Sequence, residues 1–312
     1  MRYKFLIRLL GPVLFVVILL FFIDPVQIIQ AWHSLRYDFL GWSLLTVPFI
    51  VAVRSIRWQR VLAAYSMPYS VWTCFKYNFV EMIAVAVISS AGSLIKTFYL
   101  RRDGYRFSKA ILSIFSDKAF DFLLPLLFGI FSAVSFYFNL NTDNALLVFL
   151  VILAVLFKPV QMTGVSIFPK TIPKRLKEKM ADKKWRFDHH FQQIVTALDY
   201  RSYLLSSVGF LLYYLSIYFL NLGLGLNFSF SQILCIMALT SLITAIPISF
   251  MGIGTRDAAL IAVFAWYGRS AEEAVSLSLG LLLLRLSIIL MGSIFWYLDP
   301  PPLAELKKGR DG

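Results

Sequence analysis

The sequence predicts an all-α polytopic membrane protein in which about six crossing helices and two opposed re-entrant hairpins form an inverted repeat. Three observations predict this fold: an apolar composition, short basic clusters between the apolar runs, and a small-residue pattern written once in each half. Of the 312 residues, 59% are hydrophobic and only 15% are charged. That composition excludes an ordinary soluble domain and is typical of a chain that crosses a membrane several times.

The charged and metal-binding residue types exclude several functions. The net charge of +13 comes from short clusters between apolar runs, so it indicates membrane topology and contacts with anionic lipid headgroups, not nucleic-acid binding. Cys74 and Cys235 lie in apolar segments and have no Cys or His at metal-ligand spacing, so they do not indicate a redox compartment. His33, His189 and His190 fall in expected loops. No metal site, catalytic motif or cofactor is predicted.

The basic clusters orient the expected crossings, because cytoplasmic loops are enriched in Lys and Arg. Residues 1–8 are expected in the cytoplasm, followed by an uncleaved first crossing of about 20 residues, with residues 24–38 outside. A second crossing over 39–53 then leads to Arg54, Arg57 and Arg60 inside. The later crossings are expected at 111–138, 145–165, 203–222 and 274–298, with both termini in the cytoplasm.

Two further apolar stretches are expected to enter and leave the membrane on one side. Residues 71–94 have basic flanks on both sides, which predicts a cytoplasmic hairpin, and the parity of the remaining crossings makes 233–267 a hairpin from outside. Charges at 269–273 favour neither side. Both stretches carry the same break, with Ile88, Ser89, Gly92 and Lys96 matching Ile248, Ser249, Gly252 and Arg256. Paired breaks of this kind are typical of a transport site, because broken helices need a protein or water lining within the membrane.

The second break predicts an anion-binding helix start. Gly252 and Gly254 allow unusual backbone angles, and Thr255 is expected to be the N-cap of a new helix. The free N–H groups and the dipole of such a start attract phosphate or carboxylate, and Arg256 adds a permanently charged donor fork. Asp257 has three open roles: capping the first turn, pairing with Arg256, or taking up protons. An interfacial cap facing water is the alternative for 255–257.

The first hairpin and its neighbours supply further candidates. Ser93 is expected to cap the returning helix, with Lys96 in its first turn and the hydroxyls of Ser89 and Ser90 nearby. Glu81 stands in the entering arm, where an ionisable residue at membrane depth is presumed functional. The alternative is a position near the interface, if that arm begins late.

Two further positions complete the charged set. Asp117 and Asp121 share a helix face beside Lys118. This carboxylate pair either holds a proton or steadies Arg256, or the cluster marks the cytoplasmic entrance of a crossing. Arg285 lies deep in an apolar span and should face the interior, where it meets a carboxylate or a ligand. Arg256 and Arg285 are expected to line one cavity.

These expectations define two groups of site residues. The candidate substrate-binding residues are Ser89, Ser90, Gly92, Ser93, Lys96, Gly252, Gly254, Thr255, Arg256 and Arg285. The candidates for counter-ion or proton-coupling roles are Glu81, Asp117, Lys118, Asp121 and Asp257. Cations converging at low dielectric need neutralising acids, so Asp117, Asp121 and Asp257 are expected to act as resting counter-ions.

Over nearly its whole length the chain resembles the flippase-like transmembrane domain of lysylphosphatidylglycerol synthases and its stand-alone relatives. The residues that carry the resemblance are Arg54, Arg57 and Trp58; Gly92, Lys96 and the run 99–104; Asp117, Lys118 and Asp121; and Pro247, Ser249, Gly252, Gly254, Thr255, Arg256 and Asp257. The family usually has a proline and a glycine before the first break and a glutamate after its glycine, where this chain has serines, and commonly a glutamate where Asp257 stands. The resemblance implies the translocating half without the synthase.

The sequence therefore predicts one transmembrane domain over 1–300, with halves at about 1–165 and 202–300, a basic cytoplasmic segment at 166–201 and a tail at 301–312. The basic segment is expected to be an amphipathic helix on the inner leaflet or a linker helix. The leading hypothesis is translocation of an anionic lipid, either a phospholipid or an isoprenoid-phosphate-linked lipid, across the cytoplasmic (inner) membrane. A lipid-linked glycosyl or phosphoryl transferase and a proton-coupled carrier of small solutes are the alternatives.

Membrane lipids are the expected partners, and a lipid-biosynthetic enzyme is a candidate protein partner. The identity of the lipid, the direction and energy source of transport, and the oligomeric state stay open.

Overall fold

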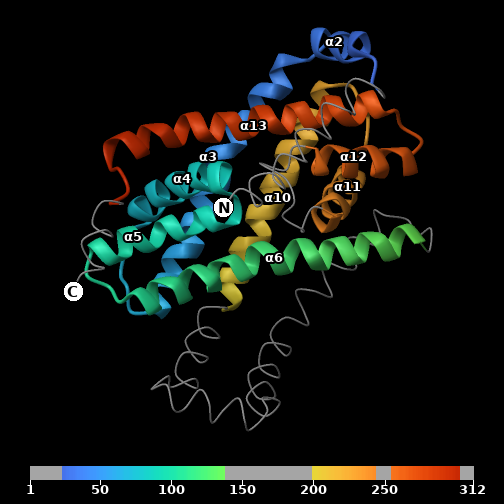
Figure 1. Ribbon diagram of the computed structural model, residues 1–312. Helices are drawn as coiled ribbons and strands as arrows, with labels where there is room; N and C mark the ends of the chain where they lie inside the picture. Colours follow the sequence, from blue (N-terminus) through green and yellow to red (C-terminus); the bar gives the residue numbers. More distant parts are fainter. Residues whose placement is uncertain (1–22, 138–198, 244–253, 303–312) are drawn as a thin grey trace, which may run out of the picture.

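The computed structural model describes residues 23–137, 199–243 and 254–302, and all regular structure in these ranges is helical, which confirms the all-α prediction. In chain order the elements are α2 (Pro25–His33), α3 (Tyr37–Ala64), α4 (Val71–Ile88), the 3-10 helix η1 (Ser89–Leu94), α5 (Ile95–Arg102), α6 (Phe107–Tyr137), α10 (Tyr200–Gly223), α11 (Phe230–Ile243), α12 (Thr255–Trp266) and α13 (Ala271–Leu298) (Figure 1).

Within the described residues, α3, α10 and α13 are long and apolar enough to cross a membrane. The two 28-residue helices, α3 and α13, have a length of about 42 Å at about 1.5 Å per residue, which exceeds a hydrocarbon core of about 30 Å. The expected crossing at 111–138 corresponds to α6. The first crossing, the crossing at 145–165, most of the basic segment and the break from Pro247 to Gly252 lie outside the described residues.

Helix α3 is much longer than the crossing predicted at 39–53. It runs on to Ala64 and carries Arg54, Arg57 and Arg60 inside the helix, so the helix does not end where the crossing was predicted to end. The prediction ended the crossing at its first cation, because an unpaired charge is costly in lipid. Here each of the three arginines has a carboxylate partner, and a paired cation does not force a helix to end.

The predicted first break is a turn of 3-10 helix between two α-helices. Gly92 lies in η1, and a Cβ at this position would overlap the backbone of Ala84 and Val85 in α4. The chain therefore doubles back tightly onto α4 before α5 begins. Leu94 is the N-cap of α5 and no side chain caps it, so the prediction of Ser93 as the cap was wrong; Lys96 lies in the first turn, as expected.

The first helix pair is α4 and α5, and the second is α11 and α12. In the second pair, a glycine precedes the first residue of α12. Gly254 is the N-cap and has a φ of +88°, a conformation that residues with a Cβ rarely adopt. Thr255 is the first helical residue, so its prediction as the N-cap was one residue off. The requirement for a positive φ explains why glycine, and not a hydroxyl residue, stands at the cap.

The two halves are built on one plan. In each half, a residue with positive φ (Ser66 or Gly225) follows a long helix by two positions, and a helix pair begins five positions after that residue. A glycine with positive φ (Gly104 or Gly268) follows the helix pair, and another long helix begins three positions after that glycine. The packing is also matched: α3 lies against α10, α4 against α13, and α11 against α6. Each contact is thus repeated when the halves are exchanged.

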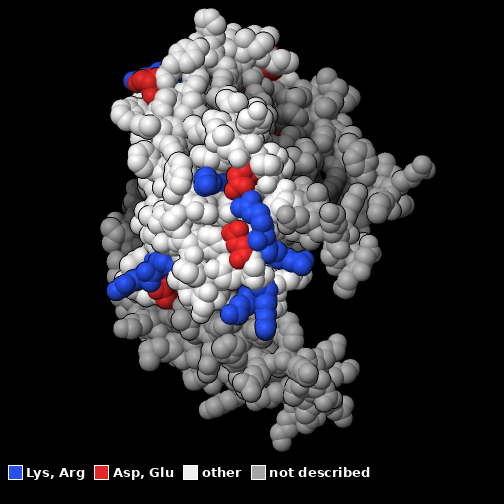
Figure 2. Space-filling view, turned by 90° about the vertical axis from the view of Figure 1, so that its left-hand side faces the viewer, with Lys and Arg blue, Asp and Glu red and all other residues white. Residues whose placement is uncertain are grey.

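The start of α4 and the end of α5 lie together at one end of the bundle. Tyr69, just before α4, donates a hydrogen bond to Asp103, just after α5, at 2.6 Å. Arg102, the last residue of α5, bonds to Asp299 after α13 at 2.7 Å. We call this the α5 end; it lies at the left in Figure 1 and is seen face-on in Figure 2, where basic side chains predominate.

The start of α11 and the end of α12 lie together at the opposite end of the bundle. Arg269, just after α12, donates to the carbonyl of Leu226, just before α11, at 3.0 Å. The N–H of Arg36 donates to the carbonyl of Gly223 at 3.0 Å. At this α12 end the α2–α3, α10–α11 and α12–α13 connections therefore come together, and the two helix pairs open toward opposite ends of the bundle.

Candidate functional site

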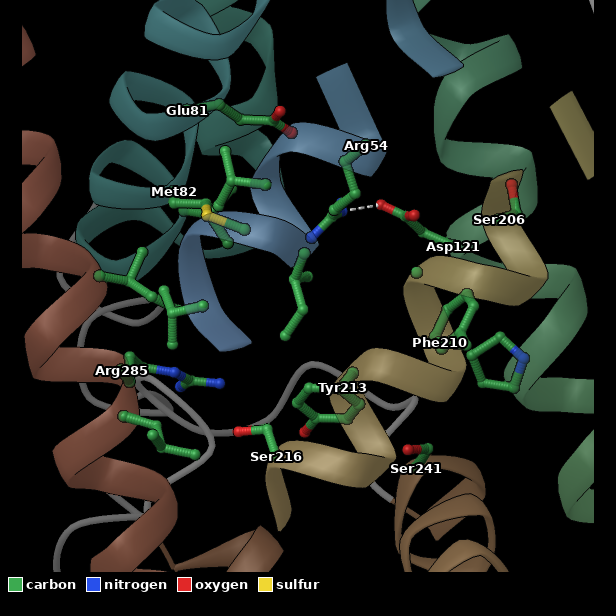
Figure 3. Close-up of a pocket in the computed structure, with 18 of the residues that line it drawn as sticks. Arg54, Glu81, Met82, Asp121, Ser206, Phe210, Tyr213, Ser216, Ser241 and Arg285 are labelled. Atoms are coloured by element: carbon green, nitrogen blue, oxygen red, sulfur yellow. Dashed lines mark hydrogen bonds and ion pairs between the residues drawn. The ribbon is translucent and has the colours of Figure 1, made fainter. Parts of the chain in front are cut away.

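A cavity of about 720 Å³ lies between the two halves. Its walls come from α3, α4, α6, α10 and α13, with single residues from α11 and α12, and most of the lining residues are apolar. Five cationic and two acidic side chains interrupt the apolar wall: Arg54, Arg57, Lys118, Arg256 and Arg285, and Glu81 and Asp121. Figure 3 shows four of them, Arg54, Glu81, Asp121 and Arg285. A cavity this charged inside a membrane helix bundle is a functional-site candidate.

Arg57 is the centre of an ion-pair network in the first half. Its Nε donates to Asp117 at 2.8 Å, its Nη2 to Asp121 at 2.9 Å and its Nη1 to the hydroxyl of Ser206 at 3.1 Å. All three edges of the guanidinium are thus used, and the residue is only 1% exposed. Arginine suits this place because its rigid donor fork serves two carboxylates at once.

Helix α5 adds Lys96 to the network. Its Nζ pairs with Glu81 of α4, lies 3.6 Å from Asp117 and stands 4.1 Å from the centre of the Trp58 ring. Lys96 is 1% exposed and is not among the residues that line the cavity. It differs in this from the expected headgroup ligand: it ties the start of α5 to α4, α6 and α3.

The remaining ion pairs of the network join residues that line the cavity. Lys118 pairs with Glu81 at 2.6 Å and with Asp121 at 3.2 Å, and Asp121 also pairs with Arg54 (Figure 3). The network as a whole, which includes Arg57, Lys96 and Asp117, holds four cations and three carboxylates from four helices. Asp117 is only 3% exposed, so its carboxylate lies inside the bundle.

In the second half, the helix start at α12 fixes Arg256. The Oδ2 atom of Asp257 accepts a hydrogen bond from the N–H of Gly254 at 2.6 Å, and its Oδ1 atom accepts one from Ser278. Arg256 donates from Nη2 to the hydroxyl and the carbonyl of Ser278 at 2.9 and 3.2 Å, and this atom lies 3.9 Å from Oδ1 of Asp257. Asp257 thus both caps the first turn and lies beside Arg256. Among the described residues, no hydrogen-bond acceptor faces the buried Nε of Arg256.

Arg285 reaches the same cavity from α13. It stands seven residues after Ser278, which is close to two helical turns, so both residues lie on one face of the helix. In Figure 3 its guanidinium points into the cavity on the side where Tyr213 and Ser216 lie. The prediction that Arg256 and Arg285 line one cavity agrees with this geometry.

The remaining candidate residues lie at the two helix starts or outside the described part of the chain. Gly92 and Gly254 shape the two helix starts, and Thr255 opens α12. Ser93 is buried, and no cap hydrogen bond from it to α5 is found. The side chains of Ser89 and Ser90 and the whole of Gly252 lie outside what the structure describes.

Sequence reasoning missed the cavity roles of Arg54, Arg57, Tyr213 and Ser216. The two arginines stand three residues apart on α3, a spacing that puts both on one helix face, opposite a carboxylate pair spaced by four. That matched spacing was the signal available. The hydroxyl residues of α10 gave no comparable signal, because tyrosine and serine are ordinary in membrane helices.

The cationic side chains that line the cavity suit an anion. No group of His, Cys, Asp and Glu side chains able to hold a metal ion occurs in the described part of the chain. Guanidinium groups keep their charge at any physiological pH and match the oxygens of phosphate in geometry.

The comparisons with known proteins agree with the fold. A family model, described as the lysylphosphatidylglycerol synthase TM region, matches residues 8–292. The chain therefore belongs to this family of transmembrane domains and is an integral, multi-pass membrane protein associated with lipid metabolism or translocation. Neither the search of curated proteins nor that of solved structures gives a match.

Proposed function

We propose that the protein translocates an anionic lipid between the two leaflets through the cavity between its halves. The observation that carries this proposal is one cavity with two kinds of wall, an apolar lining broken by Arg256 and Arg285 on one side and by the ion-pair network on the other. A lipid has the same division, because its phosphate needs cations and its chains need an apolar surface.

The headgroup would bind between Arg256 and Arg285. Arg256 is held by two hydrogen bonds to Ser278, so its fork is preorganised rather than free to search. The start of α12 adds the positive end of a helix dipole beside it. Family membership supports a lipid as the ligand, because the matching region belongs to a protein named for a lipid product.

The two helix pairs would act as opposed re-entrant hairpins of an inverted repeat. The α4–α5 pair opens toward the α5 end and the α11–α12 pair toward the α12 end, while basic side chains predominate at the α5 end (Figure 2). Cytoplasmic loops are enriched in Lys and Arg, so we place the α5 end and both termini on the cytoplasmic side of the inner membrane, within a single domain over 1–300.

The carboxylates of the network would serve as resting counter-ions. Asp121 pairs with Arg54, Arg57 and Lys118, and Glu81 pairs with Lys96 and Lys118. A phosphate that enters the cavity competes with these acids for the same cations. In the empty cavity these acids would neutralise the cations, and a bound phosphate would then replace the acids as the partner of the cations.

The test is lipid translocation in proteoliposomes that contain the full chain and a fluorescent phosphatidylglycerol. We expect Arg256→Ala to lose at least about 90% of the protein-dependent rate, since a lost charged hydrogen bond of about 1.5–3 kcal/mol is worth roughly tenfold or more. Arg256→Lys should also be impaired, because an ammonium cannot bond Ser278 and phosphate as a fork does. Arg36→Ala, which removes an exposed pair with Asp38, is the matched control.

Two results would contradict the proposal. Normal translocation by well-expressed Arg256→Ala protein would remove this residue from the mechanism. Uptake of a soluble anion with no movement of any lipid would make the protein a solute carrier instead.

A further inference from the structure

Lys118 pairs with both carboxylates that line the cavity in the described part of the chain. These acids are Glu81 of α4 and Asp121 of α6 (Figure 3). The Nζ atom of Lys118 lies 2.6 Å from Oε1 of Glu81 and 3.2 Å from Oδ2 of Asp121. Lys118 itself lines the cavity, and its side chain is 31% exposed. One ammonium group therefore lies between two carboxylates at the surface that a ligand would reach.

The other oxygens of these acids also have cationic partners. Oε2 of Glu81 pairs with Lys96, and Oδ1 of Asp121 pairs with Arg57 at 2.9 Å. The side chains of Lys96 and Arg57 are at most 2% exposed, so a ligand in the cavity does not reach them easily. Of the two ammonium groups that pair with Glu81, that of Lys118 lies on the cavity wall.

The amine of a lipid headgroup is the same chemical group as the end of a lysine side chain. It is protonated near neutral pH, as lysine is. An ammonium that leaves water needs a carboxylate, because burying an unpaired charge is costly. Between Glu81 and Asp121 such an amine would find two carboxylates, but Lys118 already occupies that place.

We infer that the cavity selects against lipid headgroups that carry an amine, and that Lys118 is the residue that determines this selectivity. The favoured ligands are lipids whose headgroup combines a phosphate with uncharged groups such as hydroxyls. Their phosphate finds cations in the cavity, and the rest of the headgroup needs no carboxylate. This inference rests on the proposed function and names the class of lipid that the same site takes.

Competition between matched lipids tests the selectivity. The full chain in phosphatidylcholine nanodiscs binds a fluorescent phosphatidylglycerol, and two pairs of unlabelled competitors are compared. Phosphatidylethanol and phosphatidylethanolamine differ by one amine, and phosphatidylglycerol and lysylphosphatidylglycerol differ by an amine-bearing lysyl group. We expect the amine-bearing member of each pair to require an about tenfold higher concentration, which is the value of one charged hydrogen bond.

Lys118→Ala assigns the selectivity to this residue. The substitution removes the ammonium between the two acids, while Glu81 keeps Lys96 and Asp121 keeps Arg57. The amine of a headgroup can then take the place of the lysine, so the difference should shrink to about twofold or less in at least one pair. A ratio within one variant does not depend on how tightly that variant binds lipids in general.

Two further variants serve as controls for charge and position. Lys118→Arg keeps a cation beside both acids and should preserve the wild-type ratios. Arg36→Gln lies outside the cavity, at an exposed pair with Asp38, and should preserve them too. If Lys118→Ala protein fails to fold, Lys118→Met keeps most of the side-chain volume without the charge and should shrink the ratios in the same way.

The outcomes separate this inference from the proposed function. A cationic lining disfavours amines even without Lys118, so unchanged ratios in the neutral Lys118 variants would overturn its role. Equal competition within both pairs by the wild-type protein would overturn the selectivity itself. In either case, binding that is lost in Arg256→Ala would leave lipid translocation standing, whereas binding that ignores Arg256→Ala would overturn the proposed function.

Discussion

At the scale of single residues, the buried charges of the first half explain how a membrane helix carries three arginines. Arg57 and Asp117 expose only 2% and 4% of their side chains. Removing one partner of a buried pair leaves the other charge unpaired, which is why such pairs resist substitution even though a complete pair adds little net stability. The network therefore specifies how α3, α4, α5 and α6 meet.

Replacing Asp117 by Asn should destabilise the protein strongly. Asp117 receives Arg57 and lies near Lys96, so Asp117→Asn leaves two buried cations short of charge. We expect a loss of about 3–5 kcal/mol in the free energy of unfolding, measured by denaturant titration in detergent micelles. Asp38→Asn is the matched control, because Asp38 pairs with Arg36 at an exposed site, and its loss should not exceed about 1 kcal/mol. Similar losses for both variants would show that burial does not govern this network.

At the scale of elements, the two helix pairs depend on close backbone approach at their turns. Gly92 sits against α4 with no room for a Cβ, whereas Gly41 in α3 has no atom within 4 Å of an added Cβ. The same substitution therefore has opposite consequences at the two positions. The comparison isolates the turn, because both changes add one methyl group to a helical glycine.

Gly92→Ala should destabilise the protein by at least about 1–3 kcal/mol, the range for added volume in a packed interior. The methyl group would push η1 off the backbone of Ala84 and Val85 and loosen the link of Lys96 to Glu81. Gly41→Ala should instead stabilise by about 0.5–1 kcal/mol, since alanine loses less backbone entropy in a helix. Thermal unfolding in detergent and lipid translocation are the two measurements. A Gly92→Ala protein as stable as Gly41→Ala would exclude the tight turn.

The sequence predicted the elements better than it predicted their ends. Long apolar runs predicted α10 and α13, and paired small residues predicted the break at η1, because both signals are local in the sequence. The caps were misplaced by one residue, since Leu94 and Gly254 act through backbone angles that a hydroxyl pattern does not reveal. Arg57 was missed because its partner Asp117 is 60 residues away. A cation followed by a loop and a cation inside a helix look alike until that distant carboxylate is known.

At the scale of the whole molecule, the two halves have the same helix packing but carry different charges. The halves repeat the same helix contacts, yet the first half holds a network of three carboxylates and the second a single carboxylate, Asp257, beside two arginines. Equal architecture lets either half approach the other in the same way. Under the proposed function, the anionic headgroup binds in the second half, between Arg256 and Arg285. If the two helix pairs are re-entrant hairpins, their directions decide from which side that ligand arrives.

Cysteine labelling tests that direction for the first hairpin. Ala63, before α4, and Arg101, near the end of α5, are exposed, as is Gln30 in α2, whereas the native Cys74 and Cys235 are buried and should give little background. If α4 and α5 form a re-entrant hairpin, Ala63→Cys and Arg101→Cys should react with a membrane-impermeant maleimide from the same side, because Tyr69 and Asp103 hold their two connections together. Gln30→Cys, at the other end of α3, should react only from the opposite side. Right-side-out and inverted membrane vesicles provide the two measurements. Labelling of Ala63→Cys and Arg101→Cys from opposite sides would mean that this helix pair crosses the membrane, and the inverted repeat would then have to be abandoned.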